Sequence, residues 1–342
     1  MKTRAKILLV YTGGTIGMIK DYDSGALKAF NFDELLQNIP ELKLLEHEIE
    51  TLSFNEPVDS SNMNPRGWLQ IAETVEENYE KYDGFVILHG SDTMSYTASV
   101  LSFMFENLHK PIIFTGSQLP IGDLRTDAKE NLITSIQIAG LQKKGEPVIS
   151  EVGLYFEYKL YRGNRTTKIN AEHFQAFASP NYTPLAESGV YLSVNDGVLW
   201  KSSLKQKTKL HKKLDDNILI LKMFPGISES TVEHILSKKS LKGVILETFG
   251  SGNAPNEAWF LNILKKKIAS GLQIVNVTQC IAGSVTMGRY ETSIELKKIG
   301  VISGKDITTE AAVGKMMYLL AKDLSTNVFK TIFETSLRGE MT

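Results

Sequence analysis

Threonine hydroxyls stand directly after the first apolar segment of the chain, inside a glycine-rich loop. Residues 6–17 read KILLVYTGGTIG, where the apolar run 7–10 predicts a buried strand and Thr12 and Thr15 follow it. A threonine at the carboxyl end of a strand is suited to be a nucleophile, because its branched Cβ leaves few rotamers and aims the hydroxyl. A glycine-rich turn without chemistry explains this stretch alone equally well.

Other polar side chains stand next to predicted strands and before the first long helix. They are Asp59, Ser60 and Ser61 before that helix, Ser91 and Asp92 after the apolar segment 84–89, and Lys168 in the segment 162–168. In open α/β sheets, ligands bind beyond the carboxyl ends of the strands. We therefore expect hydroxyls, a carboxylate and an amine to converge on one pocket.

Hydroxyl groups next to a lysine suit attack on a carbonyl carbon. A threonine hydroxyl is a weak nucleophile at neutral pH and needs a base or a lowered pKa. Lys168 could be that base if burial kept its amine neutral, whereas a nearby Asp92 would hold the amine charged. A proton relay through Ser91 is a further route, and the sequence leaves these routes open.

Several other site classes lack their sequence signatures. The stretch GGTIG matches neither the dinucleotide-binding nor the P-loop pattern, and the chain has no G-x-S-x-G elbow. No His, Cys and carboxylate cluster has metal-ligand spacing, and His89 is best interpreted as a residue packed beneath its loop. We therefore expect no cofactor and no metal ion.

The composition is that of an ordinary globular protein. The 342 residues are 42% hydrophobic and 23% charged, with a formal net charge of −1, which gives no indication of nucleic-acid or membrane binding. Cys280 is the single cysteine, so an intrachain disulfide is excluded and a reducing compartment is expected. The apolar run near the N-terminus is too short for a signal peptide, and no run reaches the length of a membrane span. These features predict a cytoplasmic protein.

Apolar segments alternate with helical patterns along the chain. Strands are expected at 84–89, 111–115, 152–156, 217–223, 243–248 and 271–278, with helices beginning after Asn64, near 128 and near 308. Such alternation is typical of βαβ units and a mainly parallel sheet. We predict an α/β protein with a larger N-terminal domain (1–190) whose mainly parallel sheet is flanked by helices, a lysine-rich linker (191–216), and a smaller C-terminal α/β domain (217–342).

Four ordered motifs resemble the signature segments of bacterial L-asparaginases, and most closely those of the cytoplasmic type I branch. They are TGGTIGM at 12–18, DSSNM at 59–63, HGSDTMSYTA at 89–98 and RGNRTTK at 162–168. The segments TGSQLPIGDLRTDAKENL, FASPN and GSGNAP extend the resemblance through both predicted domains. The resemblance therefore covers essentially the whole chain.

The resemblance implies hydrolysis of L-asparagine to L-aspartate and ammonia without a cofactor. Thr15 matches the nucleophile that forms an acyl-enzyme ester, and it lies in the N-terminal domain. Other positions match a second set that activates the nucleophile or the attacking water, namely Ser91, Asp92 and Lys168. The segment Asp59, Ser60 and Ser61 matches the part that holds the α-carboxylate of the substrate, while Asp92 also receives the α-ammonium group. A homotetramer built as a dimer of dimers is implied as well, in which the C-terminal domain of one subunit completes the site of a neighbour.

The sequence departs from the family pattern at three places. Ser91 replaces the usual threonine but keeps the hydroxyl. The usual lid tyrosine has no direct counterpart, since Ala26 aligns with it; Tyr22 and Tyr290 are the candidates for proton transfer. Some type I enzymes are regulated by asparagine at a second site that uses an arginine, and here that position is Glu247, although Thr167 and Cys280 match other parts of the same site. We therefore expect weak or absent allostery.

Two other functions remain as alternatives. One is the asparaginase-like subunit of a tRNA-dependent amidotransferase, which supplies ammonia to a partner; those subunits carry an extra N-terminal domain, whereas TGG begins here at residue 12. The other is an amino-acid-binding module without turnover, which the joint presence of nucleophile, hydroxyl, carboxylate and lysine disfavours. The preference for asparagine over glutamine is not readable, because one methylene changes the free energy of binding by only about 1–3 kcal/mol.

Overall fold

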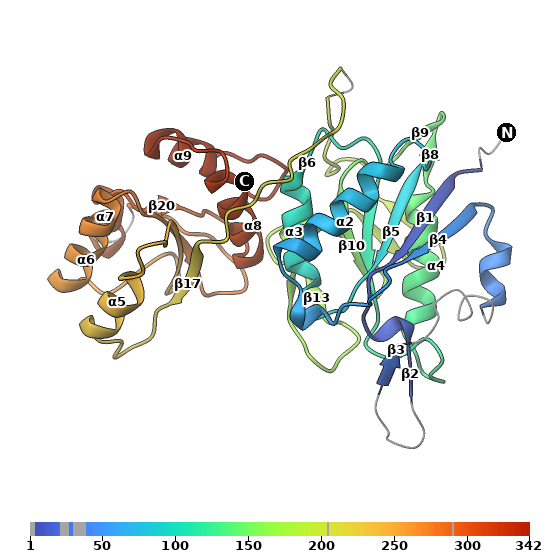
Figure 1. The fold of residues 1–342 in the computed structure, drawn as a ribbon, viewed down its shortest axis with the longest axis horizontal. Coiled ribbons are helices and arrows are strands. Elements are labelled where there is room, and N and C mark those ends of the chain that lie inside the picture. Colours follow the sequence, from blue (N-terminus) through green and yellow to red (C-terminus); the bar gives the residue numbers. More distant parts are fainter. Residues whose placement is uncertain (1–3, 21–26, 30–38, 204, 289–290) are drawn as a thin grey trace. The chain divides into compact units, whose positions relative to one another are not determined.

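A computed structural model describes residues 4–20, 27–29, 39–203, 205–288 and 291–342 (Figure 1). The chain divides into two compact units, Met1–Lys212 and Lys213–Thr342. Both units are α/β, as the sequence predicts. Among the described residues, no helix has the length and apolar character needed to cross a bilayer.

The first unit is built on an eight-stranded sheet with the order β15-β14-β11-β10-β7-β5-β1-β4. Its strands are β1 (Lys6–Tyr11), β4 (Glu48–Ser53), β5 (Gly84–Leu88), β7 (Ile112–Thr115), β10 (Val152–Phe156), β11 (Lys159–Arg162), β14 (Ala186–Ser188) and β15 (Leu192–Val194). Strands β4, β1, β5, β7 and β10 are parallel, and β11, β14 and β15 continue the sheet antiparallel. Tyr11 pairs with Ser53 on one side and with Leu88 on the other, so the carboxyl ends of β4, β1 and β5 meet at one edge.

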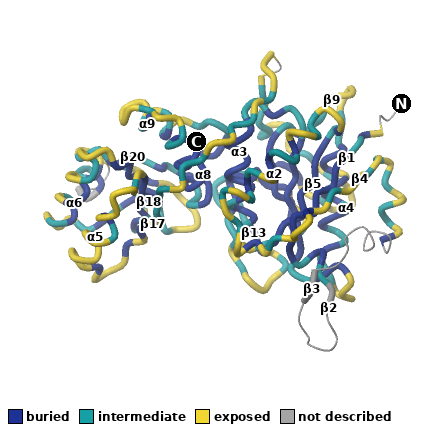
Figure 2. Tube along the Cα trace, in the orientation of Figure 1, coloured by how far each residue is buried: buried dark blue, intermediate teal, exposed yellow. Residues whose placement is uncertain are grey.

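Helices cover both faces of this sheet. They are α2 (Pro65–Asn78), α3 (Met94–Met104) and α4 (Ala128–Ala139), and Figure 1 shows α3 and α4 on opposite sides of the strands. The predicted start of α2 is confirmed, because the Asn64 side chain accepts the N–H groups of Arg66 and Gly67 while Pro65 occupies the first turn. Alternate residues of the strands pack against α4, among them Ile7 and Leu9, and the interior is buried (Figure 2).

Short elements complete the first unit. They are the 3₁₀ helices η1 (Thr15–Gly17), η2 (Pro40–Leu44), η3 (Ser60–Asn62) and η4 (Gly163–Arg165), and the strand pairs β2 (Met18–Lys20) with β3 (Leu27–Ala29), β6 (Phe105–Glu106) with β16 (Lys209–Leu210), β8 (Gln142–Lys143) with β9 (Glu146–Pro147), and β12 (Thr167–Lys168) with β13 (Phe177–Ala178). Most of the region predicted as a linker, 191–216, lies within this unit, because β15 joins the main sheet and β16 pairs with β6. Strands of two or three residues leave no readable periodicity, which is why the sequence suggested a linker there.

The second unit has a parallel four-stranded sheet with the order β17-β18-β19-β20. Its elements are β17 (Ile218–Lys222), α5 (Glu229–Leu236), β18 (Gly243–Thr248), α6 (Ala258–Ala269), β19 (Gln273–Thr278), α7 (Glu291–Lys298), β20 (Ile302–Ser303), α8 (Thr309–Leu320) and α9 (Thr326–Phe333). The cap of α8 agrees with the prediction, since the Thr308 hydroxyl accepts the N–H of Ala311.

A buried ion pair fastens the C-terminal segment of the second unit. Lys315 of α8 and Glu340 are both fully buried and in direct contact. The Lys315 ammonium also donates to the carbonyl oxygens of Phe333 (2.7 Å), the last residue of α9, and Thr335 (2.6 Å). Glu340 in turn accepts the N–H groups of Leu337 and Arg338. Burial lowers the pKa of Lys315, and Glu340 opposes that shift. This pair therefore holds α9 and the last residues on α8.

Glu340→Gln tests the importance of this pair. The substitution leaves the Lys315 charge buried without its counter-charge, so the free energy of unfolding should fall by about 3–5 kcal/mol. Urea unfolding of the full-length chain, followed by circular dichroism, measures the change. Glu295→Gln is the control, because Glu295 is half-buried and its partner Lys298 is exposed, and it should cost less than about 0.5 kcal/mol. Equal small effects at both positions would show that the buried pair adds no stability.

Candidate functional site

The turn that carries Thr15 is held from below by the last residue of β1. Gly14 has a φ of 93°, which suits glycine. The Tyr11 phenol donates to the Gly14 carbonyl oxygen at 3.4 Å, and its ring leaves no space for a Cβ on Gly17. Burial raises the pKa of Tyr11 to about 12, so the phenol keeps its proton as a donor. Thr15, half-buried, begins η1 on this support.

Three segments meet at Gly90, directly after β5. A Cβ on Gly14 would lie 2.5 Å from the Gly90 nitrogen, and a Cβ on Gly90 would lie 2.5 Å from the Ser60 hydroxyl oxygen. The Thr15 turn, the Ser60 segment and the turn that begins at Gly90 are therefore in van der Waals contact through glycine backbone. We call these three residues, Gly14, Gly90 and Ser60, the glycine contact.

The segment 59–61 is fixed by its own hydrogen bonds and by α3. Asp59 Oδ1 accepts the backbone N–H and the hydroxyl of Ser61, both at 2.9 Å, and these bonds lower the pKa of the Asp59 carboxyl. The Ser60 carbonyl oxygen accepts the Thr93 hydroxyl at 2.7 Å. Ser60 is buried, whereas Asp59 and Ser61 are exposed. The structure thus places this segment beside the turn that carries Ser91.

Lys168 contacts both Ser91 and Asp92, although 76 or more residues separate them in sequence. Its Nζ donates to Ser91 Oγ at 3.0 Å and to Asp92 Oδ1 at 2.6 Å. The Lys168 side chain is 17% exposed and that of Asp92 is 65% exposed. The predicted hydroxyl, carboxylate and lysine therefore form one cluster that opens to solvent on the Asp92 side.

Gln118, which follows β7, was not singled out by the sequence reasoning. Its Oε1 accepts the Ser91 hydroxyl at 3.1 Å, while its Nε2 donates to the carbonyl oxygens of Ala171 (3.2 Å) and His173 (3.0 Å). Because Nε2 faces two carbonyls, the amide orientation is fixed and Ser91 must donate to Oε1. The sequence feature that could have identified Gln118 is its position, three residues after the end of a predicted strand.

The remaining candidates lie elsewhere. Thr12 is buried and its hydroxyl donates to the Leu88 carbonyl oxygen at 2.9 Å, which agrees with a structural role. Tyr22 and Tyr290, the candidates for proton transfer, lie outside the described residues. Glu247 belongs to β18 in the second unit; its carboxylate accepts the Thr309 hydroxyl at 2.7 Å and lies 3.7 Å from Lys222.

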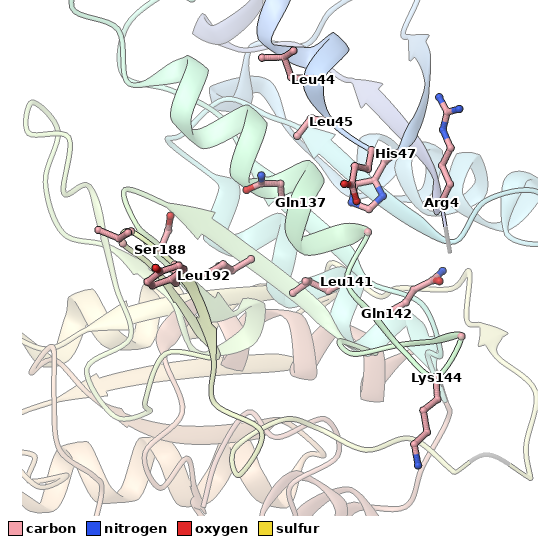
Figure 3. A pocket seen from close by; sticks show the side chains of 16 residues that line it. Arg4, Leu44, Leu45, His47, Gln137, Leu141, Gln142, Lys144, Ser188 and Leu192 are labelled. Carbon is pink, nitrogen blue, oxygen red and sulfur yellow. The ribbon is translucent and has the colours of Figure 1, made fainter. Parts of the chain in front are cut away.

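The pocket in Figure 3 is separate from the cluster of Lys168, Ser91 and Asp92. Within the described ranges, no three His, Cys, Asp or Glu side chains are grouped so as to bind a metal ion. The pocket has a volume of about 1400 Å³ and includes Arg4 and His47 in its lining (Figure 3). These residues precede β1 and β4, whereas Thr15 follows β1, so the pocket lies at the opposite ends of the strands.

Comparison with known families agrees with this geometry. Residues 6–199 match the family model described as "Asparaginase, N-terminal", and residues 217–333 match "Glutaminase/Asparaginase C-terminal domain". The chain therefore belongs to the asparaginase family.

Individual relatives locate the chain within that family. It is 41% identical to L-asparaginase 1 of Escherichia coli over 99% of this chain and 98% of the relative. The crystal structure of L-asparaginase I from Vibrio cholerae superposes with a TM-score of 0.90 at 42% identity, covering 99% of this chain and 100% of that one. One component of the glutamyl-tRNA(Gln) amidotransferase of Sulfolobus acidocaldarius is 33% identical over 99% of this chain and 76% of the relative. The predicted relationship to type I L-asparaginases is confirmed.

Gly14→Ala tests whether the glycine contact holds the site together. The added Cβ would meet Gly90 backbone, and the positive φ strains any other residue, so we expect kcat/KM to fall at least about 10-fold, since small displacements at a reacting centre have large effects. Steady-state kinetics with L-asparagine measure the loss of activity, and a thermal melt measures the effect of the strain on stability. Gly197→Ala is the control, because the nearest atom to its added Cβ is 3.6 Å away. A Gly14→Ala enzyme as active as the Gly197→Ala enzyme would rule out this role.

Proposed function

We propose that the protein hydrolyses L-asparagine to L-aspartate and ammonia, with Thr15 as the nucleophile. The observation that carries this proposal is the contact of Lys168 with Ser91 and Asp92, next to the turn that presents Thr15. Membership of the asparaginase family and the full-length likeness to L-asparaginase 1 of Escherichia coli support the substrate.

The charges around the site suit a zwitterionic amino acid. The segment Asp59, Ser60 and Ser61 offers hydroxyl and backbone donors for the α-carboxylate, and the exposed Asp92 carboxylate offers an acceptor for the α-ammonium group. Binding both ends fixes the side-chain amide relative to Thr15, which lowers the entropic cost of the attack.

The reaction would proceed through an ester. The Thr15 hydroxyl oxygen attacks the amide carbon, its proton leaves the oxygen, and the protonated amide nitrogen departs as ammonia. Water then attacks the ester carbon, its oxygen leaves with the released aspartate, and one of its protons restores the Thr15 hydroxyl. The proton passes to Tyr22, to Tyr290 or through Ser91 to Lys168 with its amine neutral, and single Tyr→Phe variants separate the tyrosine routes from the lysine route.

The bonds of Ser91 support a role for Lys168 as a positive charge in the resting site. The single Ser91 proton is used in the bond to Gln118, so the Ser91 oxygen accepts from the Lys168 ammonium. Lys168 thereby places a positive charge beside the Ser91 oxygen, where it stabilises negative charge on a hydroxyl oxygen during proton transfer.

We further propose a homotetramer that acts in the cytoplasm. The tetramer follows from the family resemblance, and the cytoplasmic location follows from the resemblance to the type I branch and from the single cysteine, Cys280. Light scattering of the purified protein measures the assembly.

Thr15→Val separates catalysis from binding. The variant keeps the shape of the side chain but loses the nucleophile, so ammonia release from L-asparagine should fall at least about 10⁴-fold while the thermal melt stays close to that of the wild type. Thr15→Ser retains a hydroxyl and should keep measurable activity. Ammonia release from Thr15→Val within 10-fold of the wild type would contradict the assignment.

The same assay decides between the proposed function and its alternatives. Likeness to an amidotransferase component favours one alternative, in which ammonia is passed to a partner. Our proposal predicts that the purified chain releases free ammonia from asparagine without partner protein or tRNA. Turnover that requires either of them supports the amidotransferase function, and tight asparagine binding without turnover supports a binding module.

The rate should depend on asparagine concentration hyperbolically. Glu247 places a carboxylate where regulated relatives are expected to have an arginine, and a carboxylate repels the carboxylate of an amino-acid effector. Initial rates across a wide concentration range measure the curve. A clearly sigmoidal curve would refute the expected absence of allostery.

A further inference from the structure

A chain of hydrogen bonds from two helices ends on the carbonyl oxygen of Gly90. Trp68 Nε1 of α2 donates to Thr97 Oγ1 of α3 at 3.0 Å, and Thr97 Oγ1 lies 3.0 Å from His89 Nε2. His89 Nδ1 lies 2.8 Å from the Gly90 oxygen. Exposure of these side chains is 6% for Trp68, 0% for Thr97 and 1% for His89, so water does not compete for the bonds.

The chemistry of the partners fixes the direction of each bond. A carbonyl oxygen only accepts, so His89 Nδ1 carries the hydrogen that is donated to Gly90. A neutral imidazole has one such hydrogen, so Nε2 is the acceptor and the Thr97 hydroxyl donates to it. Burial lowers the pKa of His89 to about 4, which keeps the ring neutral near pH 7. The indole of Trp68, a donor only, completes a chain in which every bond points toward Gly90.

Gly90 is also the centre of the glycine contact. Its backbone packs against Gly14, one residue before Thr15, and against Ser60. The peptide group is planar and trans, so fixing the direction of the Gly90 carbonyl fixes the opposite direction of the Ser91 N–H. The orientation of one peptide therefore determines where the turn with Ser91 and Asp92 begins.

We propose that His89, held in its Nδ1–H tautomer by Thr97, is a positioning residue for the reaction. It orients the peptide between Gly90 and Ser91, so that Ser91 and Asp92 meet Lys168 beside Thr15. Thr97 acts through His89 and touches no substrate atom. The inference rests on the proposed asparaginase function for its kinetic consequence, whereas the tautomer follows from the hydrogen bonds alone.

A purely structural core histidine would be equally buried. The structural role and the positioning role differ in whether turnover depends on the Thr97 hydroxyl. Thr97→Val keeps the shape but removes both the donor to His89 and the acceptor of the Trp68 N–H, whereas Thr97→Ser keeps the hydroxyl and removes a methyl group. A purely structural role makes both variants lower the melting temperature without a specific loss of kcat. A positioning role makes Thr97→Val the more damaging change for turnover.

The kinetic test compares these two variants in the full-length protein. We expect kcat for L-asparagine to fall about 10- to 100-fold in Thr97→Val, with KM changed less, because a small shift of the Ser91 turn affects the reacting geometry. Thr97→Ser should keep kcat within about 3-fold of the wild type even if its melting temperature falls. The matched control is Thr74→Val on α2, whose hydroxyl donates only to the Gln70 carbonyl of its own helix, and whose kcat should stay within about 2-fold.

A spectroscopic test reads the tautomer without turnover. Nitrogen chemical shifts of ¹⁵N-histidine-labelled protein at pH 7 should show a protonated Nδ1 and an unprotonated Nε2 for His89, whose signals are assigned by their loss in His89→Asn. Thr97→Val should shift the Nε2 signal, and Thr97→Ser should leave it in place.

The outcomes separate this inference from the proposed function. A kcat of Thr97→Val within 2-fold of the wild type, a Thr97→Ser enzyme as slow as Thr97→Val, or a His89 ring protonated on Nε2 would overturn the positioning role. Absence of ammonia release by the wild type, with the Nδ1–H tautomer observed, would overturn the proposed function and leave the hydrogen-bond chain standing.

Discussion

The site depends on the close approach of two glycine backbones, Gly14 after β1 and Gly90 after β5. Side chains at either position would push the two turns apart, since a Cβ on Gly14 would lie 2.5 Å from the Gly90 nitrogen. Parallel pairing of β1 with β5 brings the turns to the same edge, and the two glycines then let them touch. Thr15 and Ser91 follow these glycines directly, so this close approach brings their backbones near each other.

Polar contacts then orient what the glycines bring together. Lys168 reaches Ser91 and Asp92 from β12. The Gln118 amide oxygen accepts a hydrogen bond from the Ser91 hydroxyl, so the Ser91 oxygen accepts the bond from Lys168. From below, His89 holds the Gly90 carbonyl. The two sets of bonds act on opposite ends of the same short turn. A directed network of this kind needs little reorganisation when charge develops during a reaction.

The sequence predicted the elements better than the contacts between them. Strand–helix alternation and local caps identified β5, β18 and the start of α2, because those signals are carried by neighbouring residues. Strand β15 was read as part of a linker, since a strand of three residues has too few positions to show a period of two. The bond between Trp68 and Thr97 depends on how α2 packs on α3, which a single sequence does not specify. Thr15, Ser91, Asp92 and Lys168 were singled out by their places next to predicted strands, and the motifs that resemble a known family then supplied their predicted roles.

A crystal structure with the product L-aspartate bound tests the central claim most directly, because it asks whether the segments joined at Gly90 form one site. We predict that the side-chain carboxyl of aspartate contacts Thr15 Oγ1, with the α-ammonium on Asp92 and the α-carboxylate on the segment 59–61. Aspartate bound without contact to Thr15, or with its two carboxyl groups exchanged, would contradict this account.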